Sequence, residues 1–289
     1  MGYSGNPESG SSDSPAIYAA IMAFLALSLY NAVELDVIIM TLFKRQGGLY
    51  FWSFVATTNG IFPHSLGFML KNILGSHNFG LYITLVAVGW VPMVTGQSLV
   101  LYSRLHLLFW DAFYLRLVLA MIIFNAVVLH LPIIILMYGA NSSPDNSWAQ
   151  PYLVYEKIQV TVFFLQELII SALYVRACFS FFDIDDSPYG NGVRRMRRHL
   201  LLVSVLVVLL DIPILALEYA DVYDLQTAYK AFVYSVKLKM EFQILNKLVE
   251  MTRGRDQLDP LPNDNSSTIW MRQGSIHRGQ QQQQQQQPQ

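Results

Sequence analysis

The chain has 289 residues, of which 53% are hydrophobic and only 13% are charged. Soluble domains carry about a quarter charged residues, so this composition excludes an ordinary soluble domain and indicates long apolar segments. The net charge of -1 says little by itself, because the distribution of the charges carries the information, and no strongly basic surface indicates nucleic-acid binding. The single cysteine, Cys178, excludes an intrachain disulfide.

Seven apolar segments follow one another along the chain, and each is long enough to cross a membrane. A helical span needs about 20 residues, and a helix is required because lipid offers backbone polar groups no hydrogen-bond partner. The segments lie at 16–43, 49–73, 79–103, 115–138, 152–176, 199–220 and 225–249. Four of them contain a proline that favours a kink, namely Pro63, Pro92, Pro132 and Pro213. We therefore expect an all-α membrane protein, with a seven-transmembrane helix bundle over residues 16–250.

The two ends of the chain are polar and are expected to lie outside this domain. Residues 1–15 predict a disordered extracytoplasmic tail. Residues 251–289, which include the glutamine run from Gln280 to Gln287, predict a disordered cytoplasmic tail. The first apolar segment is too long for the core of a cleaved signal peptide, so we expect it to remain as a span.

Positive charge is distributed unevenly between the two sides of these segments. One side holds Lys44, Arg45, Arg104, Arg116, Arg176, Arg194, Arg195, Arg197, Arg198, Arg253 and Arg255. The opposite ends hold only Lys71 and Lys157. The positive-inside rule then places the N-terminus outside and the C-terminus in the cytoplasm. Asn141, which heads an Asn-Ser-Ser sequon, lies outside under this topology and is a candidate for glycosylation. We expect a multi-pass membrane protein and favour the plasma membrane over internal membranes.

The sixth and seventh segments carry opposite charges at matching depths. Asp211 and Glu218 are seven residues apart and share a face of the sixth segment, and Lys230 and Lys237 share a face of the seventh. If the chain reverses near Asp224, an antiparallel hairpin brings Asp211 to Lys237 and Glu218 to Lys230. Ionisable residues inside spans mark a pathway or a structural pair. We expect two intramembrane ion pairs and favour a structural role for them over a functional one.

Three further acids lie at similar depth in different segments. Glu34, Glu167 and Glu241 all fall in the half of the membrane that faces the cytoplasm, and Lys239 lies near them. Their convergence predicts a water-filled cavity or a proton-sensitive cluster. In the alternative interpretation, Glu167 is protonated or hydrogen-bonded to a glutamine side chain.

The residue types that enzymes use do not form a recognisable motif. His64 and His130, the histidines deep in the segments, have no second histidine at the spacing of metal ligands. There is no glycine-rich phosphate loop and no nucleophile elbow. We expect neither an enzyme nor a bound metal or cofactor. Lys237 with Asp211 meets the minimal requirement for retinal, but Val233 stands where microbial rhodopsins carry an aspartate.

Distinctive short stretches are spread over residues 16–250. They lie at 48–53 (GLYFWS), 94–108 (VTGQSLVLYSRLHLL), 156–159 (EKIQ), 217–220 (LEYA) and 234–242 (YSVKLKMEF). In these stretches the chain resembles a family of fungal seven-helix integral membrane proteins that is defined only as a domain of unknown function. The resemblance implies a fungal source and the same seven-helix fold, and it implies no activity.

A looser similarity links the chain to seven-helix receptors. Tyr102-Ser103-Arg104 ends the third segment on the predicted cytoplasmic side, where such receptors carry an acid-Arg-Tyr triplet. The acid is missing here, and the tyrosine precedes Arg104. The positive-inside rule explains Arg104 equally well.

We interpret the chain as a receptor-like or sensory membrane protein. The alternatives are an ion- or proton-coupled transporter or channel, and a structural membrane scaffold. The expected partners are the lipid bilayer and a small ligand or ion, with a cytoplasmic partner left open and no nucleic acid.

Overall fold

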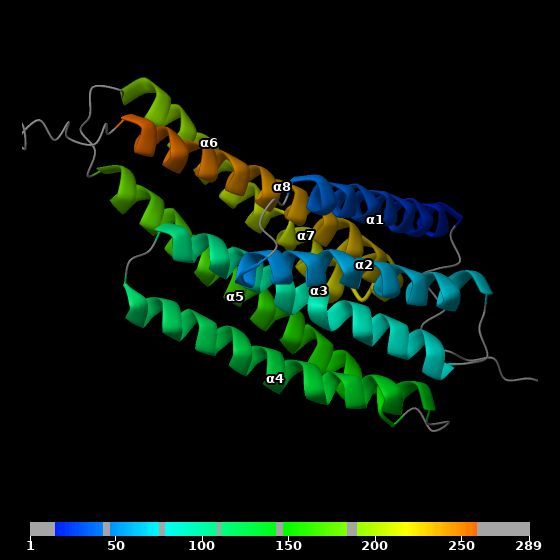
Figure 1. Ribbon diagram of the computed structural model, residues 1–289. Helices are drawn as coiled ribbons and strands as arrows, with labels where there is room; N and C mark the ends of the chain where they lie inside the picture. Colours follow the sequence, from blue (N-terminus) through cyan, green and yellow to red (C-terminus); the bar gives the residue numbers. More distant parts are fainter. Residues whose placement is uncertain are drawn as a thin grey trace, which may run out of the picture. The chain divides into compact units, whose positions relative to one another are not determined.

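The computed structural model describes residues 15–42, 47–74, 79–108, 111–142, 147–183 and 190–258, and within these ranges the chain is helical without strands (Figure 1). The helices are α1 (Pro15–Leu42), α2 (Leu49–Leu74), α3 (Phe79–Leu108), α4 (Ala112–Ser142), α5 (Ala149–Asp183), α6 (Gly190–Leu209), α7 (Asp211–Tyr219) and α8 (Tyr223–Leu258). The predicted all-α class is confirmed for this part of the chain. Residues 1–14 and 259–289 of the two predicted tails lie outside it, whereas residues 251–258 continue α8 as a helix.

Five helical segments are long and apolar enough to cross a membrane. They are Pro15–Thr41, Gly80–His106, Ala112–Asn141, Ala149–Ser180 and Arg198–Tyr219. The protein is therefore a multi-pass membrane protein. Helices α2 and α8 do not reach the same hydropathy, because α2 carries several hydroxyl and amide side chains and α8 carries charges along its length. Both need neighbouring helices to cover their polar groups in lipid.

The described helices expose apolar side chains and bury many polar ones. Met40 is 82% exposed, Phe113 is 69% exposed and Phe124 is 65% exposed. The Ser28 and Ser65 side chains are fully buried, and their Oγ atoms lie 3.1 Å apart in a hydrogen bond between α1 and α2. This distribution suits a lipid environment, where apolar side chains contact the acyl chains and polar side chains link helices to each other.

Helices α6 and α7 together form the sixth predicted segment, and they are separated only by Leu210. Pro213 lacks a backbone N–H, and its ring crowds the carbonyl of Leu209 four residues earlier. Leu210 keeps the helical values φ -68° and ψ -19°, and its N–H donates to the Leu206 carbonyl at 3.1 Å, so the break is a one-residue interruption within a span that continues in the same direction. The other three helices run without interruption through their prolines, Pro63, Pro92 and Pro132.

The chain reverses between α7 and α8 at Asp221, three residues before the position that the sequence suggests. Asp221 has a φ of 56°, a left-handed conformation that aspartate tolerates better than most residues. The backbone N–H of Val222 donates to the Leu217 carbonyl at 3.3 Å and closes the turn. Helix α8 then begins at Tyr223, so the turn spans only Ala220–Val222.

Helices α2 and α3 cross at glycines that bring the two backbones close together. A Cβ atom added to Gly60 would lie 2.7 Å from the Gly89 carbonyl oxygen and 3.1 Å from the Met93 backbone nitrogen. A Cβ atom on Gly89 would in turn meet the backbone of His64. Small residues at such crossings are the usual means by which membrane helices approach each other.

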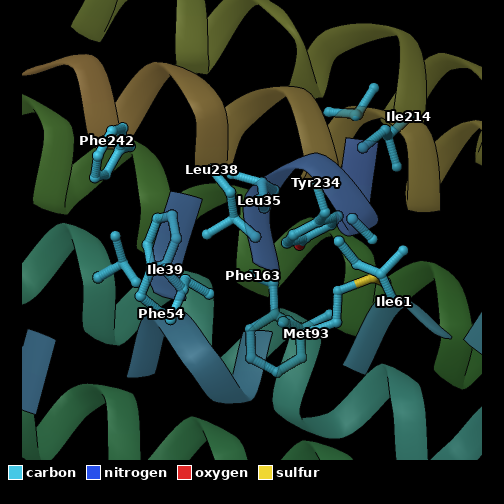
Figure 2. Packing of buried hydrophobic residues seen from close by; sticks show 14 of the residues in the cluster. Leu35, Ile39, Phe54, Ile61, Met93, Phe163, Ile214, Tyr234, Leu238 and Phe242 are labelled. Carbon is cyan, nitrogen blue, oxygen red and sulfur yellow. The ribbon is translucent and has the colours of Figure 1, made fainter. Parts of the chain in front are cut away.

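The main apolar cluster occupies the centre of the unit that ends at Ile244 (Figure 2). Its members include Leu35 and Ile39 of α1, Phe54 and Ile61 of α2, Met93 of α3, Phe163 of α5, Ile214 of α7, and Tyr234, Leu238 and Phe242 of α8. Leu129 of α4 belongs to the same cluster, so seven of the described helices contribute to one core, and α8 contributes apolar residues despite its charges.

The α2–α3 crossing predicts opposite effects for two glycine-to-alanine substitutions. Alanine is a better helix former than glycine by about 1 kcal/mol, and Gly80→Ala should keep that benefit because nothing lies within 4 Å of its added Cβ. Gly60→Ala should lower the thermal unfolding temperature, because the added Cβ meets backbone atoms that cannot rotate away. Thermal unfolding of both purified variants measures the difference, and equal stability of the two would contradict the crossing.

Candidate functional site

Helix α8 presents four polar residues along one buried face. Lys230, Tyr234, Lys237 and Glu241 follow at spacings of four, three and four residues, which place them on one side of a helix. Each of these side chains is no more than 6% exposed. A buried charge in a membrane is stable only with partners, so the contacts of this face define the candidate site.

The Lys237 ammonium lies at the centre of this face and is held by carboxylates from two other helices. Its Nζ atom donates to Glu167 Oε2 of α5 at 2.6 Å, and it also pairs with Asp211 Oδ1 of α7. The Tyr234 hydroxyl donates to Glu167 Oε1 at 3.4 Å. Lys237 is completely buried, so these carboxylates stabilise its charge in place of water, and the Tyr234 ring, whose centroid lies 5.0 Å from Nζ, adds a cation–π contact. We call Lys237, Asp211 and Glu167 the latch.

A second buried ion pair lies further along the same face, where Glu241 contacts Arg104 of α3. Arg104 Nη1 lies 2.8 Å from Glu241 Oε2, and both residues are 1% exposed. Arg104 Nη2 also donates to Ser204 Oγ of α6 at 3.4 Å. The guanidinium stacks over the Tyr174 ring, with its carbon 3.9 Å from the ring centroid. The positively charged plane over an aromatic face adds a cation–π attraction to the ion pair.

The inner acidic residues do not share one contact with Lys239 but form three different ion pairs. Glu167 belongs to the latch and Glu241 pairs with Arg104. Lys239 turns toward α1, where its Nζ atom lies 2.6 Å from Glu34 Oε2. Lys239 follows Lys237 by two residues, and two residues rotate the side chain by roughly 200° around a helix. The Lys239 and Glu34 side chains are 24% and 44% exposed, so this pair lies at the surface of the bundle.

Asp211 and Lys237 are brought together as expected, whereas Glu218 and Lys230 are not in direct contact. Both residues of the second pair are buried, yet in the described part of the chain no ion pair joins them. Because the chain reverses at Asp221, Glu218 lies three residues before the turn and Lys230 nine after it. This is an axial offset of about 9 Å. The Lys237 side chain bridges the same offset, but Lys230 faces a cavity.

The cavity has a volume of about 30 Å³ and lies beside the latch. Its polar walls are formed by Gln159, Glu167, Asp211 and Lys230. Sites for organic ligands usually measure about 300–1,000 Å³, so this cavity is too small for retinal or a comparable ligand. In the described ranges, no group of three His, Cys, Asp or Glu side chains is placed to hold a metal ion.

Sequence reasoning missed two partners of α8, Glu167 for Lys237 and Arg104 for Glu241. The sequence does contain a signal for these contacts. The seventh predicted span carries five charged residues, and each charge inside a membrane needs a partner that neutralises it. The sequence suggests that Arg104 is an orienting charge or part of a receptor-like triplet, and neither interpretation gives it a buried acidic partner, although it lies inside the apolar stretch that ends α3. Lys237 could not be matched to Glu167 because helix packing, not spacing, decides which segments are neighbours.

The candidate glycosylation residue, Asn141, lies in the last turn of α4 and is exposed. Its side-chain oxygen accepts a hydrogen bond from the Tyr82 hydroxyl at 2.7 Å, and its amide nitrogen donates to the Met137 carbonyl at 2.9 Å. Both hydrogen bonds hold the side chain on the bundle. Glycosylation at Asn141 stays a prediction.

The latch predicts that Lys237→Met destabilises the protein far more than Lys157→Met. Removing Lys237 leaves two unpaired buried carboxylates, which costs about 3–5 kcal/mol for a buried ion pair. Lys157 pairs with Asp221 at 2.6 Å, but the two side chains are 29% and 67% exposed, so water replaces that contact at little cost. Thermal unfolding in detergent or nanodiscs measures both variants, and comparable losses would refute a dominant role for the latch.

The comparisons with known proteins place the chain in a family without revealing an activity. The family described as "Domain of unknown function (DUF7703)" matches residues 10–257, which covers every described helix except the last residue of α8. Neither a curated protein nor a solved structure gives a match. The fungal source and the receptor-like kinship stay predictions. The chain belongs to the family defined by the domain of unknown function DUF7703.

Proposed function

We propose that the protein is a seven-span membrane sensor in which the latch controls the helix break between α6 and α7. The proposal places the N-terminus outside, the C-terminus in the cytoplasm and the protein in the plasma membrane. The lysines and arginines concentrated in the sequence segments that are predicted to face the cytoplasm support this orientation. The length of α2 and α8 supports two further spans beside the five apolar ones.

The observation that carries the proposal is the position of Asp211. It is the first residue of α7, directly after the break at Leu210, and its carboxylate pairs with Lys237 of α8. Releasing this one contact frees the break, while Glu167 continues to neutralise Lys237 and to hold α5 against α8. A helix break tied by one exchangeable ion pair is a two-state element, which a stimulus can shift by favouring the released state.

A movement of α6 relative to α7 would alter contacts at the second buried ion pair, which joins Arg104 to Glu241. Ser204 lies on α6, before the break, and accepts a hydrogen bond from Arg104. Arg104 in turn pairs with Glu241 on α8. A change in the angle between α6 and α7 therefore alters the contact between α6 and Arg104 of α3. This step gives the proposed sensor its output, because a rearrangement of buried groups changes a contact of α3 near its predicted cytoplasmic end.

A transporter or channel is the second candidate, and one observation favours it. The charged groups of Lys230, Lys237 and Glu241 follow one another along a single face of α8, as an ion or proton pathway requires. The third candidate, a structural scaffold, needs the same ion pairs but no movement. The three candidates differ in whether the break moves and whether ions cross.

The sensor proposal predicts that Asp211→Asn shifts α6, and a distance between two spin labels measures the shift. Leu117 of α4 and Leu202 of α6 are 58% and 61% exposed, and cysteines at these positions carry the labels in a Cys178→Ala background. Asp211→Asn should add a population of distances that the wild-type protein lacks. The matched control, Asp221→Asn, breaks an exposed pair with Lys157 and should leave the distances unchanged.

The same proteins in liposomes separate the three candidates. A sensor gives a shifted distance distribution and no proton or ion flux above that of empty liposomes. Unchanged distances in Asp211→Asn would contradict the sensor and favour the scaffold. Flux through the wild-type protein that disappears in Lys237→Ala would contradict the sensor and favour the transporter.

A further inference from the structure

The cavity beside the latch is lined by residues of α3, α5, α7 and α8, and the last three of these helices contribute polar side chains. Gln159 lies on α5, Asp211 on α7 and Lys230 on α8. Its volume of about 30 Å³ exceeds the roughly 10–15 Å³ that one water molecule needs. Phe163 and Ile214, which belong to the main apolar core, form part of the remaining wall and are labelled in Figure 2.

Each of the three polar residues has hydrogen-bonding capacity that the described residues leave unused. Gln159 is 1% exposed, and its Nε2 atom has no hydrogen-bond partner. Asp211 is 6% exposed, and its Oδ2 atom has none either, because only Oδ1 contacts Lys237. The Lys230 ammonium is 6% exposed and forms no ion pair or hydrogen bond within the described ranges. Leaving such groups unsatisfied in a buried site costs about 1–3 kcal/mol each and more when they are charged.

The hydrogen-bonding properties of these groups determine which class of molecule, called the guest below, can bind in the cavity. The Lys230 ammonium and the Gln159 amide are donors, so the guest must accept hydrogen bonds. The Asp211 carboxylate is an acceptor, so the same guest must also donate one. A halide cannot donate a hydrogen bond, and a metal cation cannot accept one. The charges of Asp211 and Glu167 are balanced by those of Lys230 and Lys237, which favours a neutral guest.

We infer that the cavity is a binding site for one water molecule that bridges Lys230, Gln159 and Asp211. The water accepts from the Lys230 ammonium and the Gln159 amide and donates to Asp211 Oδ2. The water thereby links Lys230 to Asp211, and it ties α5 to the same carboxylate. Asp211 then serves both buried lysines of α8, Lys237 directly and Lys230 through the water. The site extends the latch, but its occupancy does not depend on whether the helix break moves.

A structure of the full-length protein at a resolution that shows ordered water tests the site directly. The expected result is one density peak within hydrogen-bonding distance of Lys230 Nζ, Gln159 Nε2 and Asp211 Oδ2. An anomalous bromide peak in this position after a bromide soak would overturn the inference in favour of an anion site. A Lys230 side chain that pairs with Glu218 beside an empty cavity would overturn it as well.

Double-mutant cycles in thermal unfolding test the coupling without a new structure. The loss in unfolding temperature caused by Lys230→Met should shrink by about half or more in an Asp211→Asn background and stay unchanged in a Glu218→Gln background. The opposite result would assign Lys230 to Glu218 and overturn the inference. If Asp211→Asn does not fold, Gln159→Leu replaces it, because it removes one bond to the water and leaves the latch intact. Additive losses with Gln159→Leu would also overturn the inference.

Discussion

A lysine that is completely buried among membrane helices must have its charge neutralised there, and Lys237 meets this requirement with carboxylates from two other helices. The requirement determines which helices are neighbours. Helix α8 lies where α5 offers Glu167 and α7 offers Asp211, and this arrangement leaves the ammonium group paired. Apolar contacts fill the core around Lys237. Because an apolar side chain can contact lipid as favourably as another helix, these contacts determine the arrangement of helices less strictly than the ion pairs do.

The same constraint explains how α8 remains in the bundle although its hydropathy falls short of a membrane span. Its ion pairs reach α1 through Glu34, α3 through Arg104, and α5 and α7 through the latch. The charges that weaken α8 as an isolated span are therefore the groups that hold it in place. Asp211 lies next to the helix break, so in the proposed sensor this contact has a role beyond stability, because its release is what changes the path of the helix.

The sequence predicts the helical class, most helix positions and the proximity of Asp211 and Lys237, because hydropathy and helical spacing act within a segment or between consecutive segments. It does not predict that Glu167 joins Lys237 or that Arg104 pairs with Glu241, since these contacts depend on the packing of helices far apart in the chain. The turn at Asp221 illustrates a smaller failure. A reversal predicted three residues too late shifts both expected pairs by the same amount, yet Asp211 and Lys237 still meet whereas Lys230 faces a cavity, so spacing within the hairpin does not decide which pair forms.

Exchange of the two charges tests most directly whether the latch organises the bundle. The measurement is the thermal unfolding temperature and the yield of monodisperse protein for Asp211→Lys, Lys237→Asp and the double variant. The single variants each place like charges together in a buried site and should lose most of their folded protein. The double variant restores one lysine between two carboxylates and should recover most of the loss. A double variant no better than the worse single variant, or single variants as stable as the wild type, would contradict the account.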